Sequence, residues 1–307
     1  MNETTSRSDA TATSQLLGQV RRIEIKTRKL SQDILAGRHK SAVKGRGMAF
    51  SEVREYQYGD DVRDIDWNVT ARSPRGNDGA LRPYVKQFEE ERERTLMLLV
   101  DVSGSLAFGS RKRQKRELAT EIAATLAFSA MKNDDKIGVL FFTDRIEGFI
   151  PLGKGRRHVL RIIRELLDFR PVGVNTNLDV ALIHLRQMMK RRCTAFILSD
   201  FLDTHDLRKS LLICGRRHDV TAIQLYDPLL HNLPDVGLLY LQDTETGERK
   251  WVDTSAKRVR KAQQTWWQEE QDRMIAQFRK SGIDFVSIRT DEDYVRALIN
   301  LFSRRAR

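Results

Sequence analysis

The segment from Thr95 to Ser105, TLMLLVDVSGS, joins five consecutive apolar residues to a short oxygen-rich stretch. An apolar run of this length with turn-forming residues after it is typical of a strand buried on both faces of a sheet. Open α/β sheets bind their ligands just beyond the carboxyl ends of such strands. Asp101, Ser103 and Ser105 occupy that place here. Their hard oxygen donors suit Mg²⁺ or Mn²⁺, although Ser and Asp after a strand also serve as turn formers and helix caps.

The rest of the chain alternates apolar strands with helical patterns. Further strands are predicted at 137–142, 194–199, 220–225 and 283–288, with an antiparallel edge strand at 145–151. Helices are predicted between them at 111–132, 156–169, 178–192, 205–217 and 255–280, and Asp291 is expected to cap a last helix that ends near Phe302. This alternation predicts an α/β fold whose mostly parallel sheet is covered by helices on both faces.

Two shifts in composition suggest three segments. Residues 1–43 are expected to form a polar tail and an amphipathic helix at 14–36. Residues 44–92 are rich in charged and aromatic side chains without helical periodicity, so a small β-rich or irregular segment is expected there. Residues 93–307 form the main domain, with an inserted hairpin near 229–254 that turns at Thr246-Gly247.

Composition narrows the function classes. The chain has 307 residues, a net charge of +12 and two cysteines without metal spacing. It contains no apolar run of roughly 18 residues and no apolar leader, so we expect a soluble, cytoplasmic protein. The basic residues are scattered and are interpreted as solvated helix surface. The alternative is nucleic-acid binding, in which Trp266 and Trp267 stack on bases beside the basic start of the 255–280 helix.

Oxygen-bearing side chains also follow two other predicted elements. Thr176 lies in the loop before the 178–192 helix, and Asp200 directly follows the strand TAFILS. If the sheet is doubly wound, these residues meet Asp101, Ser103 and Ser105 at one edge. A cation that binds few carboxylates directly would keep much of its positive charge. It would therefore bind a further carboxylate from another molecule.

The order DxSxS, then Thr, then Asp resembles the metal-ion-dependent adhesion site of von Willebrand factor A domains, over roughly Thr95 to Ile288. The resemblance implies one divalent cation, Mg²⁺ or Mn²⁺, held by Asp101, Ser103, Ser105, Thr176 and Asp200. It also implies that the two serine hydroxyls bind the ion directly.

A second set of motifs comprises Glu52, Arg54, Tyr56, Gly59-Asp60, Arg63, Ile65-Asp66-Trp67, Ala71-Arg72, Tyr84 to Glu91, Asn133 to Lys136 and Ser199-Asp200-Phe201. This set resembles a bacterial family catalogued as domain of unknown function fifty-eight, whose members are similar to von Willebrand factor A proteins. The resemblance implies work with a MoxR-type AAA+ ATPase or its client, in a chaperone-like or metal-insertion role. Many relatives carry membrane spans that this chain lacks, and Asn177 follows Thr176 where relatives often have Asp.

We therefore expect a non-enzymatic, metal-dependent protein-binding module. The chain has no GxxxxGK[ST] loop, so we expect no ATP hydrolysis. The alternative is a metal-dependent hydrolase in which Asp101, Asp200 and Asp144 hold one or two ions. Against it, the chain has neither HExxH nor GxSxG, and His205 is the one histidine near a predicted strand end.

Overall fold

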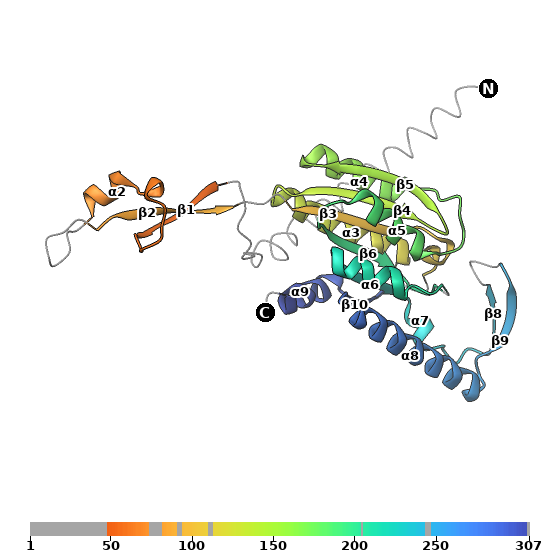
Figure 1. Ribbon diagram of the computed structural model, residues 1–307. Helices are drawn as coiled ribbons and strands as arrows, with labels where there is room; N and C mark the ends of the chain where they lie inside the picture. Colours follow the sequence, from red (N-terminus) through yellow and green to blue (C-terminus); the bar gives the residue numbers. More distant parts are fainter. Residues whose placement is uncertain are drawn as a thin grey trace, which may run out of the picture. The chain divides into compact units, whose positions relative to one another are not determined.

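The computed structural model describes residues 48–73, 82–90, 94–109, 113–203, 205–242 and 247–305 (Figure 1). The chain divides into two compact units, of which the smaller spans Lys40–Glu93 and the larger contains Arg94–Arg307. The predicted helix at 14–36 and the predicted domain boundaries near 43 and 92 lie outside the described residues.

The smaller unit is built on one antiparallel pair of strands, β1 (Met48–Glu55) and β2 (Tyr84–Glu90). Between them lie a 3₁₀ turn, η1 (Val62–Asp64), and a short helix, α2 (Trp67–Arg72), whose first amides are capped by Asp66. Arg54 binds Asp60 through two hydrogen bonds of 2.7 and 2.6 Å. The unit is thus a small hairpin held together by polar contacts.

The larger unit contains a six-stranded sheet in the order β10-β7-β6-β3-β4-β5. All neighbouring strands are parallel except β5, which runs antiparallel to β4 at one edge. The α/β prediction with an antiparallel edge strand is therefore confirmed. The strands are β3 (Thr95–Asp101), β4 (Lys136–Phe142), β5 (Ile146–Gly153), β6 (Thr194–Ser199), β7 (Asp219–Tyr226) and β10 (Asp284–Arg289).

Helices cover both faces of this sheet (Figure 1). Successive strand side chains point to opposite faces. Leu98 of β3 therefore joins a core with α3, α4 and α9, whereas its neighbour Leu99 joins a second core with α5, α6 and α8. The helices are α3 (Lys115–Lys132), α4 (Gly155–Asp168), α5 (Leu178–Met188), α6 (Arg208–Arg217), α8 (Lys257–Lys280) and α9 (Tyr294–Arg305).

Between β7 and α8 the chain forms a short helix, α7 (Pro228–His231), and an antiparallel hairpin of β8 (Leu238–Gln242) and β9 (Arg249–Asp253). The base of the hairpin is fixed by buried Thr254, which donates hydrogen bonds to Gly237 O from both its amide and its hydroxyl. The predicted turn at Thr246-Gly247 lies partly outside the described residues.

Several predicted helix ends need correction. A 3₁₀ turn, η2 (Gly104–Ala107), follows β3. The first long helix begins at Lys115 and not near Arg111, because Gln114 is its N-cap and the Glu117 side chain accepts the Gln114 amide at 3.2 Å. The last helix was predicted to be capped by Asp291. Instead the helix begins at Tyr294, so Asp293 directly precedes it and its side chain accepts the Val295 amide at 3.1 Å, whereas Asp291 pairs with Arg289. Among the described residues, no helix has both the length and the apolar character needed to cross a bilayer.

Candidate metal site

The five predicted metal ligands come from three places at the carboxyl end of the sheet. Asp101 ends β3, Asp200 follows β6, Ser103 and Ser105 lie at the start of η2, and Thr176 precedes α5. Because β3 and β6 are paired parallel neighbours, their ends lie side by side. Each of the five residues is at most 8% exposed. The fold therefore places five oxygen-bearing side chains in the protein interior, where polar groups need hydrogen-bonding or ionic partners.

Asp101 is held in a fixed orientation by the two serines nearest to it. Its Oδ1 accepts the Ser103 amide at 2.9 Å, and its Oδ2 accepts the Ser199 hydroxyl at 2.6 Å. Ser199 in turn accepts the amide of Phe201 at 3.0 Å. The hydroxyl oxygens of Ser103 and Ser105 lie 3.1 Å apart. This short network aligns the ends of β3 and β6.

The electrostatics of the site are dominated by two buried carboxylates. Burial and the charge of nearby Asp200 raise the pKa of Asp101 to about 7, against the opposing hydrogen bonds from Ser199 and Ser103. Asp200 has a cationic partner of its own, since Lys115 Nζ donates to Asp200 Oδ2 at 2.7 Å. The site therefore contains two buried carboxyl groups and one ammonium, which pairs with Asp200.

The loop that carries Thr176 is held by hydrogen bonds on both sides. Gly104 donates to Val174 O at 3.0 Å, which joins this loop to η2. On the other side, Glu147 of β5 accepts the amides of Val172 and Gly173 at 3.1 and 2.6 Å. The loop that carries Thr176 is thereby joined to η2 on one side and to β5 on the other.

The first turn of α5, directly after Thr176, is also held from outside the helix. The buried carboxylate of Asp203 accepts the Leu178 amide at 2.8 Å, and Asn177 accepts the Asp179 amide at 3.0 Å. Phe201, between Asp200 and Asp203, has a positive φ of 56°. Such a backbone conformation costs a non-glycine residue about 1–3 kcal/mol and is common at functional sites.

Four residues of this arrangement were not among the predicted site residues: Lys115, Glu147, Ser199 and Asp203. Lys115 lies in a basic run, and nothing in its sequence context distinguishes it from its exposed neighbours. Ser199 and Asp203 flank Asp200, so their nearness in sequence was the available signal. Glu147 comes from an edge strand, and only the tertiary structure brings it to the Thr176 loop.

The donor set fits a small, hard divalent cation. In an octahedral Mg²⁺ site with bonds of about 2.0–2.1 Å, neighbouring ligand oxygens are about 3 Å apart. The 3.1 Å separation between the Ser103 and Ser105 hydroxyls matches that spacing. Among the described residues no group of three His, Cys, Asp or Glu side chains is arranged to hold a metal. A cation here would therefore depend on hydroxyl oxygens as well as carboxylates.

The residues of the hydrolase hypothesis are engaged in other contacts. Asp144 accepts hydrogen bonds from Arg145 Nε at 3.2 Å and from the Thr143 hydroxyl at 3.1 Å, and these contacts lower its pKa. His205 pairs with the buried Asp203 through its Nδ1. Both residues thus have local structural partners.

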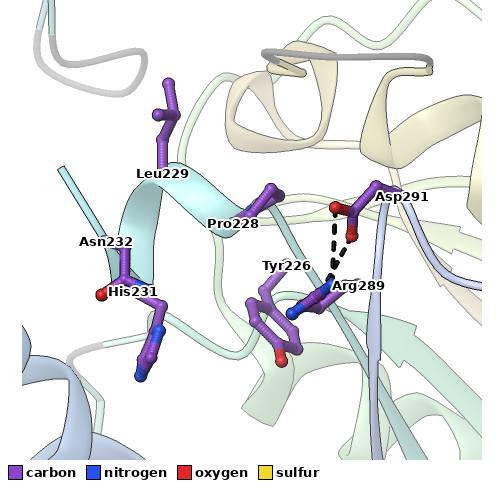
Figure 2. Close-up of a pocket in the computed structure, with 7 residues that line it drawn as sticks. All are labelled: Tyr226, Pro228, Leu229, His231, Asn232, Arg289 and Asp291. Carbon is purple, nitrogen blue, oxygen red and sulfur yellow. Dashed lines mark hydrogen bonds and ion pairs between the residues drawn. The ribbon is translucent and has the colours of Figure 1, made fainter. Parts of the chain in front are cut away.

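A cavity of about 260 Å³ lies at the ends of β7 and β10 (Figure 2). Arg289 pairs there with Asp291 at 2.9 Å beside the Tyr226 ring. Its lining contains none of the five predicted metal ligands. The lining residues are Tyr226, Pro228, Leu229, His231, Asn232, Arg289 and Asp291.

The two tryptophans of the nucleic-acid hypothesis have different environments. Trp267 is 3% exposed and packs on Tyr226, with ring centroids 5.1 Å apart, whereas Trp266 is 44% exposed. Trp267 thus anchors α8 to the end of β7 and is not available to stack on a base.

The six-stranded sheet, with one antiparallel edge strand and helices on both faces, defines a von Willebrand factor A-like α/β protein. The chain belongs to the family described as "Protein of unknown function DUF58", which matches residues 52–273. The uncharacterised protein Rv1480 of Mycobacterium tuberculosis (strain ATCC 25618 / H37Rv) is 33% identical over 295 residues, covering 95% of this chain and 90% of that protein. The uncharacterised protein MAV169 of Mycobacterium avium is 30% identical over 160 residues, covering 52% of this chain and 94% of that protein.

Solved structures with a similar fold share little sequence with this chain. BatB from Bacteroides thetaiotaomicron has 14% identity and a TM-score of 0.46, and the match covers 69% of this chain and 98% of that chain. An aerotolerance-related membrane protein from Bacteroides fragilis has 13% identity and a TM-score of 0.47, covering 69% and 99%. The SpRpn10 VWA domain has 13% identity and a TM-score of 0.37, covering 69% and 95%.

Proposed function

We propose that this chain is a non-catalytic, metal-dependent protein-binding module that serves as an adaptor of a MoxR-type AAA+ ATPase. Asp101, Ser103, Ser105, Thr176 and Asp200 would hold one Mg²⁺ or Mn²⁺. The bound cation would supply an electrophilic centre for a carboxylate of the partner or of its client. The adaptor role, chaperone-like or in metal insertion, follows from the family resemblance.

The observation that supports this proposal best is the packing of two carboxylates and three hydroxyls in a buried position. Burial raises the pKa of Asp101 to about 7, which reflects the cost of placing a second negative charge beside Asp200. A divalent cation would remove that cost. The paired hydroxyls of Ser103 and Ser105 offer two neutral ligands at a suitable spacing.

The charge of such a site favours an anionic partner. Two ionised carboxylates, one ammonium and one divalent cation leave a net charge of +1. Neutral hydroxyl ligands withdraw little of the cation's charge, so the ion keeps affinity for a further carboxylate. An Asp or Glu side chain is the commonest source of such a group on a protein surface, which makes a protein partner the chemically suitable ligand.

Titration calorimetry of EDTA-treated protein with Mg²⁺ and Mn²⁺ tests the metal part of this proposal. We expect one site in the wild type and its loss in Asp101→Asn. The matched control is Asp144→Asn, because Asp144 is a partly exposed carboxylate paired with Arg145. Metal binding that survives in Asp101→Asn, or is lost in Asp144→Asn, would contradict the site assignment.

The partner part of the proposal is tested with a purified MoxR-type AAA+ ATPase. Binding is measured by biolayer interferometry with Mg²⁺ or with excess EDTA. We expect binding that requires the metal and is lost in Asp101→Asn. Binding of equal strength in EDTA would contradict the metal-dependent mode, and no binding in Mg²⁺ would contradict the adaptor role. Phosphate or peptide hydrolysis that disappears with Asp101→Asn would favour the hydrolase instead.

A further inference from the structure

We propose that Lys115 is the resident cation of this site: it weakens the binding of a divalent metal and strengthens the binding of the partner's carboxylate. This inference rests on the proposed function, because it assigns a role to a residue of the same site. It goes beyond the five predicted ligands, since Lys115 is not one of them.

The first observation is the position of the ammonium. The Lys115 and Asp200 side chains are 3% and 1% exposed, and Nζ lies 2.7 Å from Asp200 Oδ2. Asp200 in turn interacts electrostatically with Asp101. The lysine charge therefore lies directly against one of the five predicted ligands, and because both side chains are buried it is screened little by solvent.

The second observation is that Lys115 is held in place by its backbone. It is the first residue of α3, its amide donates to Phe108 O at 3.1 Å, and α3 is closed by a capping box between Gln114 and Glu117. A cation is unfavourable at this end of a helix, where the helix dipole is positive. The lysine charge therefore does not stabilise the helix, and its favourable interaction is the ion pair with Asp200.

The third step is the charge balance. When both carboxylates are ionised, the metal-free site with Lys115 carries a charge of −1, whereas without the lysine it would carry −2. With a divalent cation the site carries +1, and without the lysine it would be neutral. Charges a few ångströms apart in protein interior interact by several kcal/mol. The lysine therefore repels the metal and attracts an anionic ligand once the metal is bound.

The test compares Lys115→Met, which keeps the length of the side chain without its charge, with the wild type. The control is Lys257→Met, which removes the same charge from an exposed position on α8. Each EDTA-treated protein is titrated with Mn²⁺ by calorimetry. We expect Lys115→Met to bind Mn²⁺ at least about tenfold more tightly than the wild type, and Lys257→Met to be unchanged.

A second measurement addresses the carboxylate. Sodium acetate is added to the Mn²⁺-loaded proteins, and the displacement of Mn²⁺-bound water is followed by proton relaxation. We expect Lys115→Met to need several-fold more acetate than the wild type. Equal acetate dependence in the two proteins would overturn the second half of the inference.

The outcomes separate this inference from the proposed function. Mn²⁺ binding by the wild type that is unchanged or weaker in Lys115→Met would overturn the role of Lys115 and leave the metal site intact. Binding by Lys115→Met alone would support the role, since the lysine would then exclude the metal. No binding by either protein would overturn both. If Lys115→Met does not fold, Lys115→Gln replaces it, because its amide still donates to Asp200, and the same criteria apply.

Discussion

The ammonium of Lys115 lies 2.7 Å from the carboxylate of Asp200, and both side chains are almost completely excluded from water. These residues are 85 positions apart in the chain, and the contact joins the start of α3 to the end of β6. A buried ion pair contributes little net stability when it is complete, but removing one partner leaves a charge without compensation. The stability of the metal-free protein should therefore depend strongly on this pair.

We predict that Lys115→Ala lowers the free energy of unfolding by about 3–5 kcal/mol in EDTA. Lys115→Met combined with Asp200→Asn should cost less than the sum of the two single changes, because no unpaired charge remains. Urea denaturation of the wild type, Lys115→Met, Asp200→Asn and the double variant measures this coupling. Lys115→Ala is compared with Lys257→Ala, which changes an exposed lysine. Strictly additive effects would show that the pair does not interact in the folded protein.

The pH dependence of stability should contain a contribution from His218. Its ring is buried, Nδ1 lies 3.4 Å from Cys193 Sγ, and burial, followed by the charges of Arg217 and Arg192, lowers its pKa below 6.5. The unfolded chain therefore binds a proton more readily than the folded chain as the pH falls below about 6.5. His218 should thus make the protein less stable in acid.

We predict that His218→Asn makes this acid-induced loss of stability shallower, by at most about 1.4 kcal/mol per pH unit. The free energy of unfolding is measured by urea denaturation at a series of pH values between neutral and weakly acidic. His184→Asn is the control, because that side chain is only partly buried. Parallel pH profiles for the wild type and His218→Asn would contradict the prediction.

Glu147 should determine the rigidity of the loop that carries Thr176. Its carboxylate accepts the amides of Val172 and Gly173 and the hydroxyl of Thr143. We predict that Glu147→Ala costs about 1–3 kcal/mol of stability and speeds the hydrogen exchange of the Val172 and Gly173 amides. The control is Glu165→Ala, which changes an exposed residue of α4. Unchanged hydrogen exchange at the Val172 and Gly173 amides would contradict the role of Glu147 in holding this loop.

The two adjacent tryptophans of α8 should differ sharply in their contribution to stability. Trp267 is buried against Tyr226, so Trp267→Ala should cost about 3–5 kcal/mol. Trp266 is 44% exposed, and Trp266→Ala should cost less than about 1.5 kcal/mol. Thermal and chemical denaturation of the two variants test this difference, and similar losses in both would contradict the packing of α8.

The local pattern of the sequence was enough to predict the type of most elements. Strands β3, β4, β6 and β7 are nearly continuous apolar runs because both of their faces are buried, and such runs are visible without any tertiary information. The ends of the helices were harder to predict. Asp291 and Asp293 are both suitable capping residues, and the structure uses Asp293 because the helix begins at Tyr294.

The sequence by itself determined the α/β class, the carboxyl-edge position of Asp101 and Asp200, and the hydroxyl-rich donor set. These follow from strand periodicity and from the rule that parallel strands end at one edge. Only the tertiary structure decided that Lys115 pairs with Asp200, that Glu147 accepts hydrogen bonds from the Thr176 loop and that Trp267 is buried. These contacts join residues far apart in the chain, and their strength depends on exclusion of water, which is a property of the folded protein and not of any local stretch of sequence.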